Sequence, residues 1–320
     1  MMKTVLTPVI ADMPLVDPLD ALDALQALTH AAPAAVLPLR SDEGVQLLGA
    51  ILIDAGKLTV EDTERVMRLQ QTQSMRFGAA AIELGLLNQG DIEHALARQF
   101  DFPYLIEGES RAAKELVAAY APFSPQVEAL RGLRSQLMLR WFAAHTRRRA
   151  LAIISPGRGE GRSYTAANLA IVFSQLGERT LLIDANLRQP RQHTLFGLEN
   201  RHGLSAILAG HGALSHPQRV PQLANLAVLT AGATPPNPQE LLGRPNFAKL
   251  LEHFSQEYDV ILIDTPAGNE YADAQGLACL AGGALLVTRR HYSNLKNAGK
   301  LCEDLRELGV QLVGSVFGQF

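Results

Sequence analysis

The stretch LAIISPGRGEGRSYTAANLAIVFSQL, residues 151–176, predicts a strand, a glycine-rich loop and a helix in direct succession. Its first four residues are apolar, as in a buried strand, and its last eleven carry apolar residues three and four positions apart, as in a helix with one buried face. Gly157, Gly159 and Gly161 lie between these two parts. Glycines allow backbone N–H groups to turn inward, and the helix N-terminus adds a partial positive charge. The stretch therefore predicts a loop that binds phosphate groups.

The loop nearly matches the nucleotide-binding pattern G-x-x-x-x-G-K-[ST] at residues 156–163. Pro156 stands at the position of the first glycine and Arg162 at that of the lysine, while Ser163 retains the hydroxyl that would bind Mg²⁺. Arginine also neutralises phosphate charge, although its larger planar group is not interchangeable with lysine. We expect nucleotide contacts from Gly157, Arg158, Gly159, Glu160, Gly161, Arg162, Ser163, Tyr164 and Arg188. A glycine-rich turn without a ligand is the alternative.

Composition places the chain among globular proteins of two domains. It has 320 residues, 47% of them hydrophobic and 19% charged, and a net charge of −3, which gives no reason to expect a nucleic-acid partner. Cys279 and Cys302 have neither metal-ligand nor disulfide spacing, which fits a reducing compartment. No apolar run approaches the length of a membrane span, and the first residues lack the apolar segment of a secretion signal. We expect a cytoplasmic protein.

The sequence divides into four predicted segments. Residues 1–42, with scattered prolines, are expected to be a flexible arm, 43–106 a helical repeat domain, 107–147 a helical linker, and 148–320 the nucleotide-binding domain. The repeat is visible as two copies 29 residues apart, in which Gly49 matches Gly78 and Asp62 matches Asp91. Thr59 and Asp62 predict a capping box at the second helix of the first copy.

The repeat resembles the N-terminal domain of type II secretion and pilus assembly ATPases. In the form of that domain that binds cyclic di-GMP, each copy begins Arg-Leu-Gly. Here the second copy reads Arg76-Phe77-Gly78 and the first Leu47-Leu48-Gly49, so one arginine is missing. The resemblance implies either a protein-docking domain without nucleotide or a cyclic di-GMP site, and the missing arginine favours docking.

Within the linker, Glu128, Arg131 and Arg134 form the pattern E-x-x-R-x-x-R on one helix face. One interpretation is a solvated charged stripe. The other is a contact between subunits, in which the arginines pair with carboxylates of a neighbouring copy.

From residue 149 onward, apolar strands alternate with helices, which predicts an α/β fold with a doubly wound, mostly parallel sheet covered on both faces. We expect strands at 151–154, 180–184, 226–230, 260–264, 284–288 and 312–316. In such a fold, the ligand lies at the carboxyl ends of the strands.

Two aspartates follow this rule. Asp264 ends the strand of DVILIDTPAG like the aspartate that holds Mg²⁺ opposite the loop serine, and Asp184 ends the strand of TLLIDANLRQPRQ. We expect Ser163, Asp184 and Asp264 to hold Mg²⁺, and Arg162, Asp184 and Asp264 to be catalytic, with Asp184 as the base or as a further magnesium group. The proline-rich segment 232–242 is expected to wall the nucleotide site.

Over residues 127–320 the chain resembles the bacterial tyrosine kinases, most closely the EpsG type of exopolysaccharide clusters. The resemblance rests on five features together: the loop, IDANLR, PPNPQELL, IDTP and E-x-x-R-x-x-R. That resemblance implies a fold like that of ParA and MinD ATPases and an ATP- and Mg²⁺-dependent autokinase that acts on neighbouring copies. It also implies a homo-oligomer at Glu128, Arg131 and Arg134, a membrane polysaccharide co-polymerase as partner through its cytoplasmic tail, and a peripheral place at the inner membrane.

Three departures keep alternatives open: Arg162 replaces the usual lysine, Asn186 replaces a second aspartate, and the chain ends GSVFGQF without a tyrosine cluster. The six tyrosines are scattered through the sequence, so phosphorylation of a tail is not expected. A ParA/MinD-like ATPase switch is one alternative. A non-catalytic scaffold gated by nucleotide, for which Asn186 is the best argument, is the other.

Overall fold

The computed structural model describes residues 7–9, 41–100, 102–106, 108–143, 148–211 and 216–319, with the side chains of residues 7–9 and 41–47 outside that description. The chain divides into two compact units, one within Gln26–Pro103 and one that comprises strand β1 and Tyr104–Phe320. Of the predicted arm at 1–42, residues Thr7–Val9 form β1 and helix α2 begins at Ser41, while the rest lies outside the described residues.

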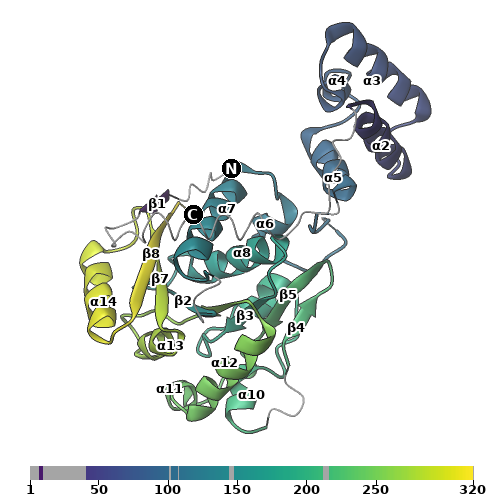
Figure 1. Cartoon of the computed structure of the whole chain (residues 1–320). Coiled ribbons are helices and arrows are strands. Elements are labelled where there is room, and N and C mark those ends of the chain that lie inside the picture. The colour runs from purple at the N-terminus through teal and green to yellow at the C-terminus, as the bar shows by residue number, and fades with distance from the viewer. Residues whose placement is uncertain are drawn as a thin grey trace. The chain divides into compact units, whose positions relative to one another are not determined.

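The larger unit is built on an eight-stranded sheet with the strand order β1-β8-β7-β2-β6-β3-β5-β4 (Figure 1). The six inner strands run parallel to one another, and β1 and β4 pair antiparallel at the two edges. The strands are β1 (Thr7–Val9), β2 (Ala150–Ile154), β3 (Thr180–Asp184), β4 (Gln218–Val220), β5 (Leu223–Leu229), β6 (Val260–Asp264), β7 (Gly283–Arg289) and β8 (Gln311–Gly318). This confirms the predicted α/β fold and all six strands that the apolar runs indicated.

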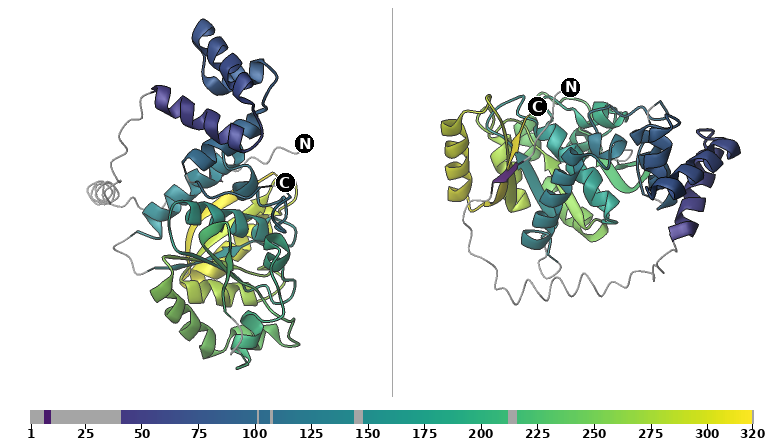
Figure 2. Two further views of the ribbon diagram at one scale, coloured as in Figure 1. Left: turned by 90° about the vertical axis from the view of Figure 1, so that its right-hand side faces the viewer. Right: turned by 90° about the horizontal axis from the view of Figure 1, so that it is seen from above.

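Helices cover both faces of the sheet, as the uninterrupted apolar strands require. Along β2, Leu151 and Ile153 pack with the helix α8 side of the sheet, whereas Ala152 and Ile154 pack with α13 and α14 on the other side. Figures 1 and 2 show this layered arrangement. The helices of the unit are α6 (Val117–Tyr120), α7 (Pro125–Arg140), α8 (Arg162–Gln175), α9 (Gln192–Phe196), α10 (Leu204–Leu208), α11 (Pro238–Leu242), α12 (Pro245–Glu257), α13 (Asp273–Ala281) and α14 (Leu295–Glu307).

The segment predicted as a linker packs into the core of this unit. Leu130 and Leu137 of α7 are buried against α8, and Asn168 of α8 accepts a hydrogen bond from the Ala118 N–H at 2.9 Å. At the end of α7, the Trp141 indole donates to the Ala150 carbonyl at 2.9 Å. A Cβ atom at Gly283 would lie 2.4 Å from the Trp141 ring, so the indole requires a glycine at the start of β7.

The smaller unit holds the sequence repeat as two helix pairs, α2 (Ser41–Asp54) with α3 (Val60–Gln73) and α4 (Phe77–Glu83) with α5 (Gln89–Gln99). The predicted capping box at Thr59 and Asp62 is present, and its repeat mate at Asn88 and Asp91 forms a second one. Gly56 and Gly85 both end a helix with positive φ, 67° and 68°. Leu52, Val66, Phe77 and Ile92 form part of the core of this unit.

Candidate functional site

The glycine-rich loop joins β2 to the N-terminus of α8 at the carboxyl edge of the sheet. Gly159 and Gly161 have φ values of 69° and 88°, which L side chains rarely adopt. Gly161 is the N-cap of α8 and has no side chain that could satisfy the first N–H groups of the helix. These donors are therefore left for a ligand, as in other phosphate-binding helix ends.

Asp184 and Asp264 lie side by side at this edge, because β3 and β6 pair in parallel and place the two residues opposite each other. Both side chains are fully buried. Burial and the neighbouring Asp264 raise the pKa of Asp184 to about 8. Burial likewise raises the pKa of Asp264, opposed by the Arg162 charge and by hydrogen bonds from Gln192 and Ser163. The site thus brings together two carboxyl groups whose charged forms are disfavoured, and a bound cation would favour those charged forms.

The Asp184 carboxylate is also the anchor of the segment that follows β3. Its Oδ2 accepts hydrogen bonds from the N–H groups of Arg191 and Gln192, both at 2.9 Å, and its Oδ1 from the Asn186 N–H at 3.2 Å. The Asn186 side chain accepts a bond from the Gln189 N–H at 3.2 Å. Asn186 therefore holds the turn beside Asp184, where the family pattern has a second carboxylate.

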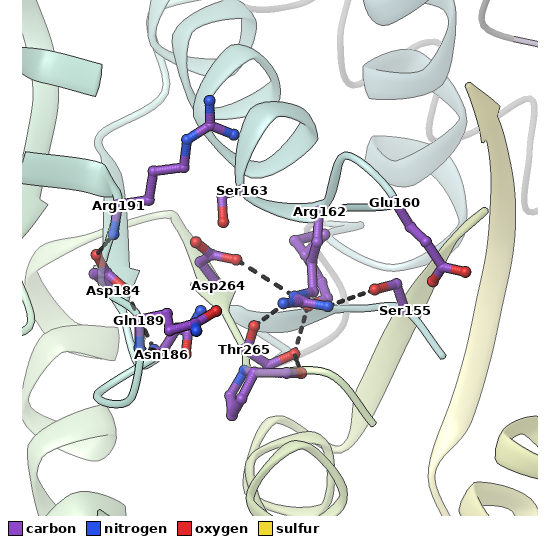
Figure 3. A network of polar contacts seen from close by, with 12 residues as sticks. Ser155, Glu160, Arg162, Ser163, Asp184, Asn186, Gln189, Arg191, Asp264 and Thr265 are labelled. Atoms are coloured by element: carbon purple, nitrogen blue, oxygen red, sulfur yellow. Dashed lines mark hydrogen bonds and ion pairs between the residues drawn. The ribbon is translucent and has the colours of Figure 1, made fainter. Parts of the chain in front are cut away.

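Arg162 points into the protein at the base of the loop (Figure 3). Its guanidinium donates to the Thr265 carbonyl, to the Ser155 hydroxyl and, at 3.3 Å, to the Gly157 carbonyl. Burial lowers the pKa of Arg162, which the nearby Asp264 and Glu160 counteract. These contacts use Nε and Nη1, so the guanidinium would reach a ligand through Nη2 or after an exchange of partners.

The residues at this edge fit a bound Mg²⁺ with a nucleotide. Oδ1 of Asp264 is buried and accepts no hydrogen bond from the described residues. The Arg162 Nε atom, 3.8 Å from it, is too far away for a hydrogen bond. The Ser163 hydroxyl is directed toward the same carboxylate in Figure 3 and lowers the pKa of Asp264. A free carboxylate oxygen beside a hydroxyl is a ligand pair that Mg²⁺ takes.

Glu160 stabilises the loop on the side that faces the turn after β7. Its carboxylate accepts the Gly157 N–H at 2.8 Å and the Ser293 hydroxyl at 2.6 Å. Arg289 at the end of β7 donates to the Gly159 carbonyl at 3.0 Å. The turn after β7 is therefore attached to the loop at two points, a contact that no sequence pattern indicated.

Three residues predicted to contact the nucleotide are engaged elsewhere in this structure. Arg158 bonds to Glu270 at 2.6 Å and to the Tyr271 hydroxyl at 2.7 Å, and Arg188 bonds to Asp273 at 2.7 Å. Tyr164 is largely buried, and its hydroxyl accepts a hydrogen bond from Gln126. Their roles toward a nucleotide stay predictions.

Gln192 was missed by the sequence analysis. Its side-chain amide donates to Asp264 Oδ2 at 2.8 Å and to the Ser163 carbonyl at 3.1 Å, so it connects the segment after β3 to both the loop helix and β6. Glutamine in a polar stretch carries no pattern of its own, and only the fold brings it to the two aspartates.

The proline-rich segment 232–242, predicted to wall the site, packs at its first residue against α10. Gly232 has a φ of 81°, and a Cβ atom there would lie 2.6 Å from the Ser205 hydroxyl. Asn200 exchanges hydrogen bonds with the Gly232 backbone at 2.9 and 3.0 Å. Its role toward a ligand stays a prediction.

The E-x-x-R-x-x-R pattern lies on α7. Glu128 and Arg131 form an ion pair at 3.0 Å. Arg134 is half-buried and donates to the Val172 carbonyl at 2.9 Å, and burial lowers the pKa of its guanidinium. Arg134 thus attaches α7 to α8.

In the smaller unit, Arg76 is the N-cap residue of α4 and Phe77 is buried in the helical core. Gly78 faces Ile92, whose nearest atom would lie 3.1 Å from an added Cβ. A cyclic di-GMP site here rests on the family resemblance alone.

A family model described as ATPase MipZ matches residues 153–289, the part that holds the loop and both aspartates. The chain is also similar to the putative tyrosine-protein kinase CapB of Staphylococcus aureus, with 35% identity over 62% of this chain and 86% of that protein. Tyrosine-protein kinase YwqD of Bacillus subtilis is 37% identical over 65% of this chain and 86% of its own length. The chain belongs to the bacterial tyrosine kinases.

Solved structures agree with this membership. The kinase domain of the Escherichia coli tyrosine kinase Etk has a TM-score of 0.61 and 33% identity, over 64% of this chain and 79% of that one. The chimerical protein CapA2B2 has a TM-score of 0.59 and 33% identity, over 70% and 97%. Longer relatives exist: the chain covers 28% of the tyrosine-protein kinase wzc of Salmonella typhimurium, at 35% identity.

As a bacterial tyrosine kinase, the chain is an ATP- and Mg²⁺-dependent enzyme. No helix among the described residues is long and apolar enough to cross a membrane.

Proposed function

We propose that this bacterial tyrosine kinase phosphorylates tyrosines on copies of itself or on a partner, and thereby regulates the chain length, polymerisation and export of an exopolysaccharide. The observation that carries the catalytic part is the pair of buried aspartates at adjacent strand ends, beside Ser163 and below the glycine loop. Phosphoryl transfer needs positioning and charge neutralisation more than covalent help from the protein.

Each site residue then has a role. Ser163 and Asp264 hold Mg²⁺, which, when bound, neutralises charge on the phosphates. Asp184 acts as a further magnesium group or as the base for the tyrosine hydroxyl, and its pKa of about 8 is near the working pH that general base catalysis favours. Arg162 compensates charge at the base of the loop, where Gln192 fixes the Asp264 carboxylate.

The partner and the assembly follow from the family resemblance. We propose that the cytoplasmic tail of a membrane polysaccharide co-polymerase binds the kinase and keeps it at the inner membrane, and that copies meet through α7. The Glu128 side chain is 72% exposed and the Arg131 side chain, paired with it at 3.0 Å, is 19% exposed, so Glu128 gives the main support for such a contact.

The test is incubation of the purified chain with γ-labelled ATP and Mg²⁺, with and without the co-polymerase tail. We expect label on tyrosine, and a loss of at least about a hundredfold in Asp264→Asn, because one preorganised group at the transferred charge is removed. Asp259→Asn is the matched control, since Asp259 precedes the amino end of β6 and pairs with Arg179. Release of free phosphate without labelled protein would favour the ATPase switch. Nucleotide binding with neither free phosphate nor labelled protein would favour the scaffold.

A further inference from the structure

A tyrosine lies between two arginines beside the glycine loop. Tyr271 belongs to the segment between β6 and α13, and its hydroxyl accepts a hydrogen bond from Arg158 Nη2 at 2.7 Å. The Arg188 guanidinium carbon lies 4.0 Å from the centroid of the Tyr271 ring, and that of Arg158 lies 5.8 Å from it. Arg158 comes from the glycine loop and Arg188 from the segment after β3. Two elements of the nucleotide site therefore meet at this tyrosine.

The backbone keeps Tyr271 at the loop. The Gly268 N–H donates to the Ser155 carbonyl at 2.9 Å, and the Asn269 N–H donates to the Pro156 carbonyl at 3.0 Å. The segment that leads to Tyr271 thus runs along the start of the loop, directly after the Asp264 strand. The tyrosine itself is partly exposed.

Four of the five other tyrosines are less well placed. Tyr120 donates its hydroxyl to the Ala112 carbonyl, Tyr164 is largely buried, and Tyr258 precedes β6 at the opposite end of the sheet. Tyr292 is 58% exposed near Gly159, but a single guanidinium, that of Arg289, lies over its ring, at 5.1 Å. Of these tyrosines, Tyr271 alone has two arginines at its ring.

We propose that Tyr271 is a phosphate acceptor of this kinase and that Arg158 and Arg188 hold the phosphate. The step rests on the proposed function: the bond between the γ-phosphorus of ATP and its bridging oxygen breaks, a bond from the Tyr271 Oη to that phosphorus forms, and ADP leaves. The phenolic proton passes to a carboxylate of the enzyme or to water.

The charges around Tyr271 give the modification a consequence. Arg158 now pairs with Glu270 at 2.6 Å, and Arg188 pairs with Asp273 at 2.7 Å. A phosphate on tyrosine carries about −1.5 to −2 charges and binds arginine through several oxygens. It competes with Glu270 for Arg158, because both anions lie within reach of that guanidinium. Phosphorylation therefore changes the partner of a side chain on the glycine loop.

The first experiment maps phosphotyrosine by mass spectrometry after the full chain has been incubated with ATP and Mg²⁺, with a tyrosine-containing copolymer as a second substrate. We expect phosphate on Tyr271 and loss of that site, with the fold intact, in Tyr271→Phe. Tyr292→Phe is the matched control and should keep it. Labelled copolymer or other labelled tyrosines, with Tyr271 unmodified, would overturn this inference alone. No label on either substrate would overturn the kinase proposal as well.

The second experiment tests Arg158 with Glu270→Gln, which removes the carboxylate that competes for this arginine and keeps the shape of the side chain. The phosphorylated variant and the phosphorylated native chain are treated with a tyrosine phosphatase. We expect removal of the Tyr271 phosphate to be at least about threefold slower in the variant, since Arg158 is then free to bind the phosphate. An equal or faster rate would show that Arg158 does not hold it.

Discussion

At the scale of single residues, we expect the neighbouring carboxyl groups of Asp184 and Asp264 to make nucleotide binding depend on pH. In the folded chain the pKa of Asp184 is about 8, against an ordinary value of 3.8, so the folded state binds a proton that the unfolded state releases. This group therefore stabilises the ligand-free protein at low pH, and that contribution is lost as the pH rises from about 4 to about 8. If Asp184 holds Mg²⁺ as proposed, binding of the ion would require this proton to leave.

We predict that the affinity for Mg²⁺ with ADP rises as the pH increases toward 8, with proton release measurable by calorimetry in buffers of different ionisation enthalpy. Over the same range, the melting temperature of the ligand-free chain should fall. Asp264→Asn should make the melting temperature depend less on pH, because it removes the like charge beside Asp184. Affinity that stays constant between about pH 6 and pH 8.5 would refute the magnesium assignment.

Asn186 offers a second prediction at this scale. Asn186→Asp keeps the acceptor for the Gln189 N–H and adds a third carboxylate beside Asp184. We expect the Mg²⁺ concentration for half-maximal phosphorylation to fall about tenfold, as with other groups around a metal. Asn186→Ala loses the acceptor and should lower stability without that gain. If Asn186→Asp leaves the Mg²⁺ dependence unchanged, this position lies outside the metal site.

At the scale of elements, the two capping boxes of the smaller unit are equivalent. Thr59 and Asn88 each accept the N–H three residues ahead, at 3.1 and 3.0 Å. We predict that Thr59→Ala and Asn88→Ala each cost about 1 kcal/mol in the free energy of unfolding of this unit, measured by circular dichroism in urea. Thr72→Ala, at an exposed hydroxyl within α3, should cost less than about half of that. Equal losses at all three positions would exclude capping as the cause.

The six central strands were predictable because each is an apolar run long enough to be buried on both faces. Strands β1 and β4 were not, since each has three residues at an edge of the sheet and no apolar pattern. The capping box at Thr59 and Asp62 was predictable, because a capping box involves residues three positions apart in the sequence.

The site was predictable only where residues follow strand ends. Asp184, Asp264 and Ser163 come together as the strand order requires. The orientation of Arg162 was not predictable, because it depends on carbonyl groups that the Thr265 turn places below the loop. Gln192 at the start of α9 and Tyr271 before α13 are brought to the site by the loops that precede them, whose paths no periodicity specifies.

At the scale of the whole molecule, the pattern on α7 can be separated into its internal and external contacts. Arg134 is bound to Val172 of its own chain, so we test Glu128 and Arg131, which pair with each other. The exchange Glu128→Arg with Arg131→Glu keeps an ion pair within the helix but reverses the charges that a neighbouring copy meets.

We predict that this exchange abolishes the proposed oligomer, measured by light scattering after gel filtration, and leaves the melting temperature within about 2 °C of the native value. The control is Glu64→Arg with Arg68→Glu, a comparable exchange of an exposed pair on α3 in the smaller unit. If the α7 exchange leaves the oligomer intact, the pattern is a solvated stripe.

Trp141, which packs against Gly283, gives the chain an intrinsic fluorescent probe. It contains a single tryptophan, whose indole is 1% exposed at the junction of α7 and the first residue of β2. The emission of one buried indole shifts to longer wavelength when water reaches it, and here no second fluorophore of that kind obscures the shift. Trp141 follows α7, the helix of the proposed subunit contact, and bonds to β2, the strand that leads to the glycine loop. Its fluorescence can therefore respond both to changes at the subunit contact and to changes at the loop, without an added label. A spectral change on assembly, on addition of nucleotide, or on both would reveal in real time whether the two events communicate through this junction.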